Sequence, residues 1–232
     1  MSASNLGPQA SLDLTHVLYD DDSYLSLLLA LITLSPILLM ASYAALAVQS
    51  RELLIIVMWA GQLTNEVLNY GIKHLIKEER PTDMVGNGYG LPSSHSQYMG
   101  YFSTFLILHM YFRHRFSSTG YPILDRAFRA LVHLALLAWA GGVAYSRYHL
   151  KYHSPHQIYW GLSIGVAFAS ILYASLELLP FSPSLKSALL NNPIAIWLQI
   201  RDGWAVWSDA GREAEWKRWR KEWEELSRKK QA

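Results

Sequence analysis

The chain alternates long apolar stretches with short polar segments. Five stretches approach the length of a membrane span, at residues 23–48, 53–72, 96–112, 130–145 and 158–179. A helix needs about 20 mainly apolar residues to cross a hydrocarbon core of roughly 30 Å. The first, second and fifth stretches meet this requirement, whereas the other two are short and need polar-lined ends or a surrounding bundle. The pattern predicts an all-α, polytopic membrane bundle of about five transmembrane helices.

Composition supports this class. Hydrophobic residues make up 51% of the 232 residues and charged residues only 16%, whereas a soluble domain normally carries about a quarter charged residues. Buried helices of a soluble protein are the alternative, which the block-wise distribution of apolar residues disfavours. The first stretch exceeds the about 7–15 apolar residues of a signal peptide, so we expect it to remain as an anchor. Cysteine is absent, so disulfide bonds are not expected.

The basic residues predict an orientation. If the N-terminus defines one side of the membrane, that side also receives the loops after the second and fourth stretches. This side holds five basic residues, Lys73, Lys77, Arg80, Arg147 and Lys151, and the opposite side holds the other fifteen of the twenty. Lys and Arg concentrate in cytoplasmic loops. We therefore expect the N-terminus and these two loops to be exoplasmic and the C-terminus to be cytoplasmic.

The C-terminal region differs from the rest of the chain. We expect a membrane-embedded domain at 1–180 and a cytoplasmic connector and tail at 181–232. Four apolar side chains in the tail recur at helical spacing among basic residues: Trp216, Trp219, Trp223 and Leu226. This pattern predicts an amphipathic helix lying in the cytoplasmic headgroup region. Packing on a partner, or on the protein's own core, is the alternative.

Two polar clusters flank the loop between the second and third stretches. The first is KHLIKEERP, residues 73–81, in which Lys73 and Arg80 would share one helix edge if the helix continued. The second is PSSH, residues 92–95. Small residues at a helix start leave backbone N–H groups available for phosphate oxygens. A helix-capping role for one of the serines is the alternative.

The third cluster is SRYHLKYHSPHQ, residues 146–157. The planar fork of Arg147 can grip a phosphate, and the three histidines offer ring nitrogens for nucleophilic attack or proton transfer. These histidines are His149, His153 and His156. Their spacing would also suit a metal, but no carboxylate or cysteine accompanies them and Pro155 interrupts the helix that would align them. We therefore expect neither a metal nor another cofactor.

All three clusters are predicted to lie on one side of the membrane. Lys73, Arg80 and Arg147 would then surround one point, together with two serines, a helix N-terminus and at least two histidines. This set favours a tetrahedral oxyanion, and phosphate above others. Phosphoryl transfer depends mainly on positioning and charge stabilisation, which these residues can provide without a metal.

The ordered motifs resemble a known family. Lys73 with Arg80 and Pro81, then residues 92–95, then Arg147 with His153, resemble the three-part signature of the type 2 phosphatidic acid phosphatase superfamily. Its members are integral membrane phosphatases whose sites are related to those of vanadium haloperoxidases. The resemblance covers about half of the chain, from the second to the fifth stretch.

The resemblance implies a role for each position. His153 would attack the terminal phosphorus to give a phosphohistidine that water later cleaves, and His95 would protonate the leaving oxygen. The remaining motif residues would hold the phosphate oxygens: Lys73, Arg80, Ser93, Ser94 and Arg147.

Two departures from the family's usual motif residues narrow the resemblance to one branch of the family. Ser94 stands where the family usually has glycine, and Gln157 stands where it usually has aspartate. Together with NEVLN, IKEERP and YGLPSSHSQYM, they resemble the branch that hydrolyses dolichyl diphosphate to dolichyl phosphate, recycling the lipid carrier of N-glycosylation in the endoplasmic reticulum. A glutamine oxygen can accept the ring N–H of His153 but adds no full charge. We therefore expect a less basic histidine than in relatives with aspartate.

Other interpretations remain open. A broader lipid phosphate phosphatase would act on phosphatidate or sphingoid phosphates, and a non-catalytic lipid-binding membrane protein would only keep the pocket. The presence of both His95 and His153 argues against the second. The expected partners are the lipid substrate and the bilayer, and nucleic acid is not expected. Glycines within the apolar stretches predict close helix packing: Gly100, Gly141, Gly142, Gly161 and Gly165.

Overall fold

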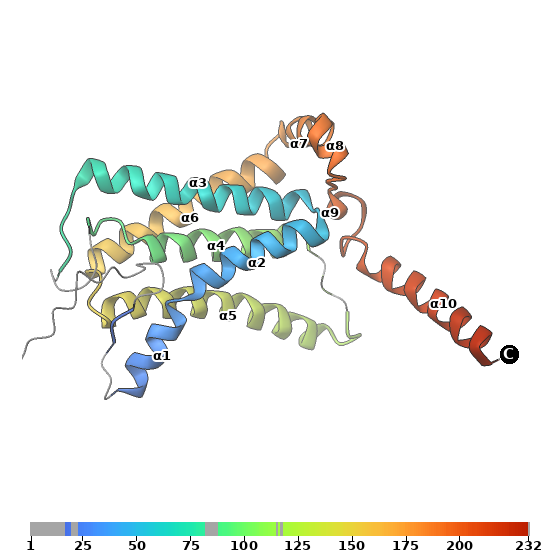
Figure 1. Cartoon of the computed structure of the whole chain (residues 1–232), viewed down its shortest axis with the longest axis horizontal. Helices are drawn as coiled ribbons and strands as arrows, with labels where there is room; N and C mark the ends of the chain where they lie inside the picture. Colours follow the sequence, from blue (N-terminus) through green and yellow to red (C-terminus); the bar gives the residue numbers. More distant parts are fainter. Residues whose placement is uncertain (1–16, 20–22, 82–87, 115, 117, 232) are drawn as a thin grey trace, which may run out of the picture.

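The computed structural model describes residues 17–19, 23–81, 88–114, 116 and 118–231 (Figure 1). Within these ranges the chain is helical, and its one β-type pairing is an isolated bridge between Glu52 and Arg201. The prediction of an all-α protein is therefore confirmed. Elongated helices lie side by side as a bundle, and the C-terminal segments gather at one end of it (Figure 1).

The first apolar stretch forms two helices instead of one. Helix α1 covers Tyr24–Ile32 and helix α2 covers Ser35–Ser50. Pro36 lies in the first turn of α2 and has no backbone N–H, so it cannot continue the hydrogen-bond ladder of α1. The chain changes direction at this break (Figure 1). The two helices together are still long and apolar enough to span a membrane.

Four longer helices complete the bundle: α3 (Leu53–Ile76), α4 (Ser94–Phe112), α5 (Pro122–His149) and α6 (Pro155–Glu177). Of these, α5 and α6 meet the length and composition of a membrane span. The expectation that the fourth stretch is short is wrong, because α5 begins eight residues before 130. The first turns of α5 carry charged residues, so the apolar pattern of the sequence does not include these turns.

Helices α3 and α4 are more polar and are not among the helices with the length and composition of a membrane span, so the prediction that the second stretch meets this requirement is wrong. Their polar side chains face the bundle interior, where Gln62, Asn65 and Gln97 are fully buried. The amide of Gln97 donates to the backbone O and the Oδ1 of Asn65 at 3.0 and 2.8 Å, and its Oε1 accepts from Asn69 at 2.8 Å. Buried polar groups need such partners. This network fixes the start of α4 against α3.

The closest helix contact joins α4 and α6. A Cβ atom added at Gly165 would lie 2.2 Å from the backbone O of Gln97, and one added at Gly161 would lie 2.6 Å from the backbone O of Ser93. Gly100 faces Leu162 of α6 in the same way, at 2.7 Å. The predicted role in close packing is confirmed for these three glycines. It is wrong for Gly141, where an added Cβ atom would meet no heavy atom within 4 Å.

The segment after α6 folds back on the bundle. It contains α7 (Ser182–Leu190), α8 (Pro193–Trp197) and α9 (Gly203–Val206). Lys186 pairs with both Glu177, at the end of α6, and Asp202, whose Oδ2 lies 2.8 Å from the lysine nitrogen. Buried Glu52, before α3, accepts hydrogen bonds from Arg201 and from the backbone of Gly203. These contacts hold the segment from α7 to α9 against the helical bundle.

Helix α10, Arg212–Gln231, extends away from the bundle (Figure 1). It carries three exposed ion pairs at four-residue spacing, which stabilise an isolated helix modestly. Trp216, Trp219 and Trp223 are half exposed, and the last two rings stack with centroids 5.9 Å apart. A tail helix with an unpartnered aromatic stripe matches the predicted amphipathic helix, and its location at a membrane surface remains a prediction.

Candidate active site

The three predicted motifs meet at one end of the bundle. Helices α3 and α5 finish at this end, and α4 and α6 begin there (Figure 1). The chain therefore brings together side chains that lie more than 70 residues apart in sequence. The segments α7 to α10 lie at the opposite end (Figure 1).

The first motif leaves the helix earlier than expected. Helix α3 ends at Ile76, and Lys77 adopts a left-handed conformation with φ of 57°. Arg80 consequently lies in a loop, where its Nε donates to the backbone O of Gly88 at 3.3 Å. Because α3 does not continue to Arg80, the condition under which Lys73 and Arg80 would share a helix edge is not met. Both side chains nevertheless act electrostatically on His153, so both remain at the site.

The second motif starts α4 without a side-chain cap. Ser93 occupies the cap position and is fully buried, but its hydroxyl accepts from Ser96 at 3.0 Å instead of capping a backbone N–H. The capping alternative therefore does not account for Ser93. The first turn of α4 keeps N–H groups that no side chain caps, which suits an anion.

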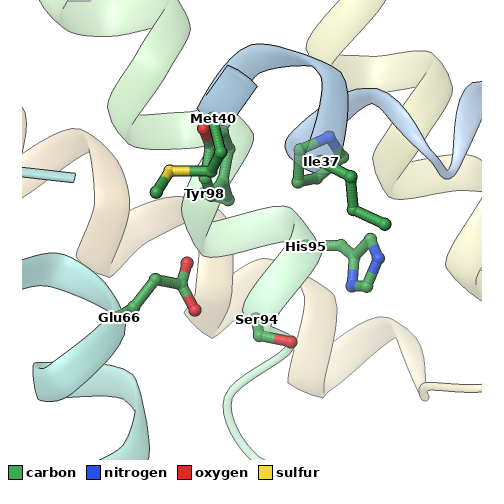
Figure 2. Close-up of a pocket in the computed structure, with 7 residues that line it drawn as sticks. Ile37, Met40, Glu66, Ser94, His95 and Tyr98 are labelled. Carbon is green, nitrogen blue, oxygen red and sulfur yellow. The ribbon is translucent and has the colours of Figure 1, made fainter. Parts of the chain in front are cut away.

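Ser94 and His95 line a cavity of about 320 Å³. Figure 2 shows them projecting from α4, with Glu66 of α3 reaching toward them across the same space. Pro36, Ile37, Met40 and Tyr98 complete the lining. The cavity thus combines polar groups at its α4 end with an apolar wall from α2. This combination suits an amphiphilic ligand.

His153 lies in the loop between α5 and α6 and is buried. Its Nδ1 lies 3.1 Å from Oε1 of Gln157, so the contact expected from the sequence is present. The amide nitrogen of Gln157 donates to Oε1 of Glu78 at 2.9 Å and to the backbone O of Glu79 at 2.8 Å. These two acceptors fix the amide orientation and leave its oxygen facing the ring. Nδ1 therefore carries the proton, and Nε2 keeps a free electron pair.

Gln157 also caps α6. Its Oε1 accepts from the backbone of Ser154, whose hydroxyl accepts from the backbone of Gln157, and each distance is 3.3 Å. This reciprocal pair is a capping box. The backbone O of Gln157 also accepts from the N–H of Ser93 at 3.0 Å. One residue therefore positions the histidine, begins α6 and joins the second motif to the third.

Arg147 is a buried cation at the end of α5. Its guanidinium lies 3.8 Å above the ring of Tyr152, and its Nε has no hydrogen-bond partner among the described residues. None of the ion pairs within the described part of the chain includes Arg147 or Lys73. Buried charges are costly unless they are paired. The site is therefore complementary to an added anion.

Burial and the same charges determine the protonation state of His153. Together, burial and the nearby cations Arg147, Arg80 and Lys73 lower the pKa of His153 to about 3, against a raising effect of the Gln157 hydrogen bond. An ordinary histidine has a pKa of about 6.5. His153 is therefore neutral near pH 7, as a nitrogen nucleophile must be.

The other two histidines of the third motif have separate contacts. His149 Nε2 lies 3.2 Å from the hydroxyl of Ser26, and His156 accepts from the indole of Trp160 at 2.9 Å. Within the described ranges, no three His, Asp or Glu side chains gather as metal ligands. Glu78, which binds Gln157 from the loop of the first motif, is not among the site residues predicted from the sequence. Its position between Lys77 and Arg80 was the available signal.

Helices of this arrangement, with an anion site at the shared end of four of them, define a membrane-embedded phosphatase-like protein. The family model described as the PAP2 superfamily matches residues 53–179, which contain all three motifs. The chain belongs to the PAP2 superfamily.

Within this superfamily the chain is similar to proteins named dolichyldiphosphatase. It is 37% identical to dolichyldiphosphatase 1 of Dictyostelium discoideum over 194 residues, which cover 82% of this chain and 81% of that protein. It is 36% identical to the Homo sapiens protein of the same name, covering 82% and 80%. Identity to the dolichyldiphosphatase of Saccharomyces cerevisiae is 35%, covering 69% and 68%. No solved structure matches the chain.

Proposed function

We propose that the chain hydrolyses dolichyl diphosphate to dolichyl phosphate and inorganic phosphate, and so recycles the lipid carrier of N-glycosylation. The similarity to named dolichyldiphosphatases extends over most of the chain, and the match to the PAP2 superfamily includes every motif of the site. The observation that supports the chemistry best is His153, a buried neutral imidazole whose Nδ1 is held by Gln157. Nearby Arg147 and Lys73 form no ion pair within the described residues.

The first step is attack by His153. Its free Nε2 forms a bond to the terminal phosphorus while the bond from that phosphorus to the bridging oxygen breaks. His95, in its imidazolium form, gives one proton to the bridging oxygen, which leaves on dolichyl phosphate. His95 lines the cavity beside α4 and lies within electrostatic range of His153. Burial and the neighbouring cations lower the pKa of His95 in the absence of an anion, so in this proposal His95 takes up its proton when the anionic diphosphate binds. A phosphohistidine mechanism is general to the PAP2 superfamily.

The second step is hydrolysis of the phosphohistidine. A water attacks the phosphorus, His95 accepts the proton from that water, and the bond between phosphorus and Nε2 breaks. Inorganic phosphate leaves, and both histidines return to their starting states. The lipid product remains in the bilayer.

The remaining motif residues hold the transferring group. Lys73, Arg80 and Arg147 balance the charge on the phosphoryl oxygens, and the N-terminus of α4 with Ser93 and Ser94 donates hydrogen bonds. Such groups stabilise a phosphoryl-transfer transition state by position and charge. In this proposal neither a metal nor another cofactor takes part. Turnover is therefore expected to persist in the presence of a chelator. Loss of turnover in the chelator, with recovery on addition of a divalent cation, would contradict metal-independent hydrolysis.

The apolar wall of the cavity suits the substrate's isoprenoid tail. Ile37 and Met40 of α2 face the space beside His95 and Ser94 (Figure 2). The diphosphate would therefore lie at the start of α4 while the first isoprene units follow α2 toward the membrane interior.

We place the enzyme in the membrane of the endoplasmic reticulum, with the site in the lumen and the C-terminus in the cytoplasm. The unequal distribution of basic residues supports this orientation. Residues 1–180 form the membrane-embedded domain in this proposal, and 181–232 form the cytoplasmic connector and tail. Helix α10 then lies at the cytoplasmic surface, with its three Trp side chains at the headgroups and its basic residues near anionic lipid.

The absence of natural cysteine allows a direct test of orientation, because one introduced cysteine labels without background. Lys77→Cys near the site and Lys217→Cys in the tail are both exposed positions. In sealed microsomes a membrane-impermeant maleimide is expected to label the second variant only. Labelling of both variants, or of Lys77→Cys alone, would contradict the proposed orientation.

The function itself is tested with a panel of lipid substrates. Purified protein is offered dolichyl diphosphate, dolichyl phosphate, phosphatidate and a sphingoid phosphate, and phosphate release is measured. We expect dolichyl diphosphate to be the preferred substrate and His153→Ala to lower its turnover by about 1,000-fold or more. His74→Ala is the matched control, because His74 is an exposed histidine of the first motif. Equal turnover of phosphatidate would favour the broader lipid phosphatase, and phosphate release by His153→Ala at a rate near that of the natural chain would exclude the covalent mechanism.

A further inference from the structure

The glutamine beside His153 does not supply the negative charge that the proposed reaction requires. As the imidazole attacks phosphorus it becomes cationic, and a carboxylate beside Nδ1 would stabilise that charge. Gln157 orients the ring but is neutral. The three nearby cations oppose a positive charge on the imidazole. The site therefore needs a source of negative charge behind Gln157.

Glu78 is placed to provide that charge. Its Oε1 accepts a hydrogen bond of 2.9 Å from the amide nitrogen whose partner oxygen faces His153. The three side chains thus form a continuous array, from the imidazole through the amide to the carboxylate. An amide polarised by a carboxylate at its nitrogen has a more negative oxygen, because hydrogen bonds in a chain strengthen one another.

The loop that carries Glu78 is held in place on both sides. Lys77 turns out of α3 in the left-handed conformation, and the backbone O of Glu78 accepts from the N–H of Gly90 at 2.7 Å. A Cβ atom at Gly90 would lie 2.5 Å from the amide nitrogen of Gln157, so the backbone at Gly90 packs directly against this amide. Glu78 therefore does not reach Gln157 by a chance surface contact.

We propose that Glu78 is a positioning residue that acts through Gln157 to orient His153 and to stabilise the charge that develops on it. The inference rests on the proposed hydrolytic function of the same site. It gives this chain a His–Gln–Glu array in place of the His–Asp pair that the family usually has. The partial exposure of Glu78 and a His156 nitrogen 3.7 Å from its carboxylate are compatible with this role, because the charge on Glu78 is needed and not its burial.

The test compares two neighbouring glutamates in two backgrounds. Glu78→Gln keeps the size of the side chain and removes the charge. Glu79→Gln is the matched control, because the Glu79 side chain is exposed and its backbone O, the atom that binds Gln157, is unchanged. Both substitutions are made in the natural chain and in Gln157→Asp, where a carboxylate would contact the ring directly.

In the natural background we expect Glu78→Gln to lower kcat about 10-fold or more, with KM changed less than about twofold, because the contribution appears as the imidazole becomes charged. Glu79→Gln is expected to change kcat less than about twofold. In the Gln157→Asp background Glu78→Gln should have little effect, or should raise kcat by removing a second carboxylate. Such dependence on the background measures direct coupling between the two positions.

Each other outcome overturns the inference. Equal activity of Glu78→Gln and the natural chain excludes a role, and the same loss in both backgrounds indicates a purely structural one. If Gln157→Asp does not fold, Gln157→Ala serves instead: with the amide absent, Glu78→Gln should cost less than about twofold. The pairs are measured on whichever lipid of the panel is turned over fastest. Failure of the natural chain on every lipid would instead refute the proposed function.

Discussion

The backbone N–H of Ser93 donates to the backbone O of Gln157 across 3.0 Å, so the second and third motifs are joined directly. This contact requires the start of α4 to lie against the first turns of α6. Gly161 makes the approach possible, since its missing side chain leaves room for the backbone O of Ser93.

Gly161→Ala should therefore damage both stability and activity. The new methyl group would lie 2.6 Å from the backbone O of Ser93, and α4 would have to move. Overpacking of this kind costs about 1–3 kcal/mol, and we expect a lower thermal midpoint in detergent together with slower phosphate release. Gly141→Ala is the control. It meets nothing within 4 Å and should keep activity.

Gln157→Ala should lower turnover while the protein remains folded. The substitution removes the acceptor that holds Nδ1 of His153 and leaves Nε2 free for attack. We expect kcat to fall about 10- to 100-fold, as befits loss of an orienting group and not of the nucleophile. Single-turnover formation of the phosphoenzyme measures this step. A Gln157→Ala protein as active as the natural chain would show that the hydrogen bond has no orienting function.

The pH profile should reflect the lowered pKa of His153. With a pKa of about 3, His153 stays neutral well below pH 6.5, so the acid limb of kcat/KM should not fall at an ordinary histidine value. Arg147→Met removes the nearby cation with the largest effect, which should raise the pKa of His153 and move its acid limb to higher pH.

The control for this measurement is Arg113→Met, since Arg113 pairs with Glu177 at the opposite end of the bundle. Its profile should match that of the natural chain. Each profile is scaled to its own maximum, so that weaker substrate binding does not affect the comparison. An acid limb that stays in place in Arg147→Met would argue against this electrostatic account of His153.

Lys186→Met should destabilise the protein at the end away from the site. The substitution removes the cation that Glu177 and Asp202 share, so Asp202 loses its ion pair while Glu177 keeps its pair with Arg113. Removing one partner of a buried pair costs about 3–5 kcal/mol, so the thermal midpoint should fall clearly. Lys217→Met removes an exposed ion pair in α10 and should leave the midpoint unchanged. Similar midpoints for both variants would mean that the connector does not stabilise the bundle.

Much of the fold followed from the sequence because apolar blocks of membrane length leave few alternatives to a helical bundle. The helix break before Pro36 and the early start of α5 did not follow, because local backbone chemistry and charged first turns are invisible to an apolar pattern. The convergence of the motifs was predictable, since antiparallel spans return alternate loops to the same side.

The finer structure of the site was not predictable in the same way. A continued helix would have placed Arg80 on the edge of Lys73, but the left-handed Lys77 ended α3 first. That turn also brings Glu78 to Gln157 across 79 positions of sequence. Sequence spacing predicts partners within one element, whereas contacts of this kind depend on the path of a loop.

The backbone contact between α4 and α6 has a consequence for how a bulky lipid is accommodated. His95 is on one of these helices and His153 immediately precedes the other, so a rigid seam sets the separation of the two imidazoles. Any widening that admits an isoprenoid chain is therefore expected on the α2 side of the cavity, where Pro36, Ile37 and Met40 form the wall. The separation of the two histidines can then stay constant while the cavity wall on α2 adjusts to the isoprenoid chain.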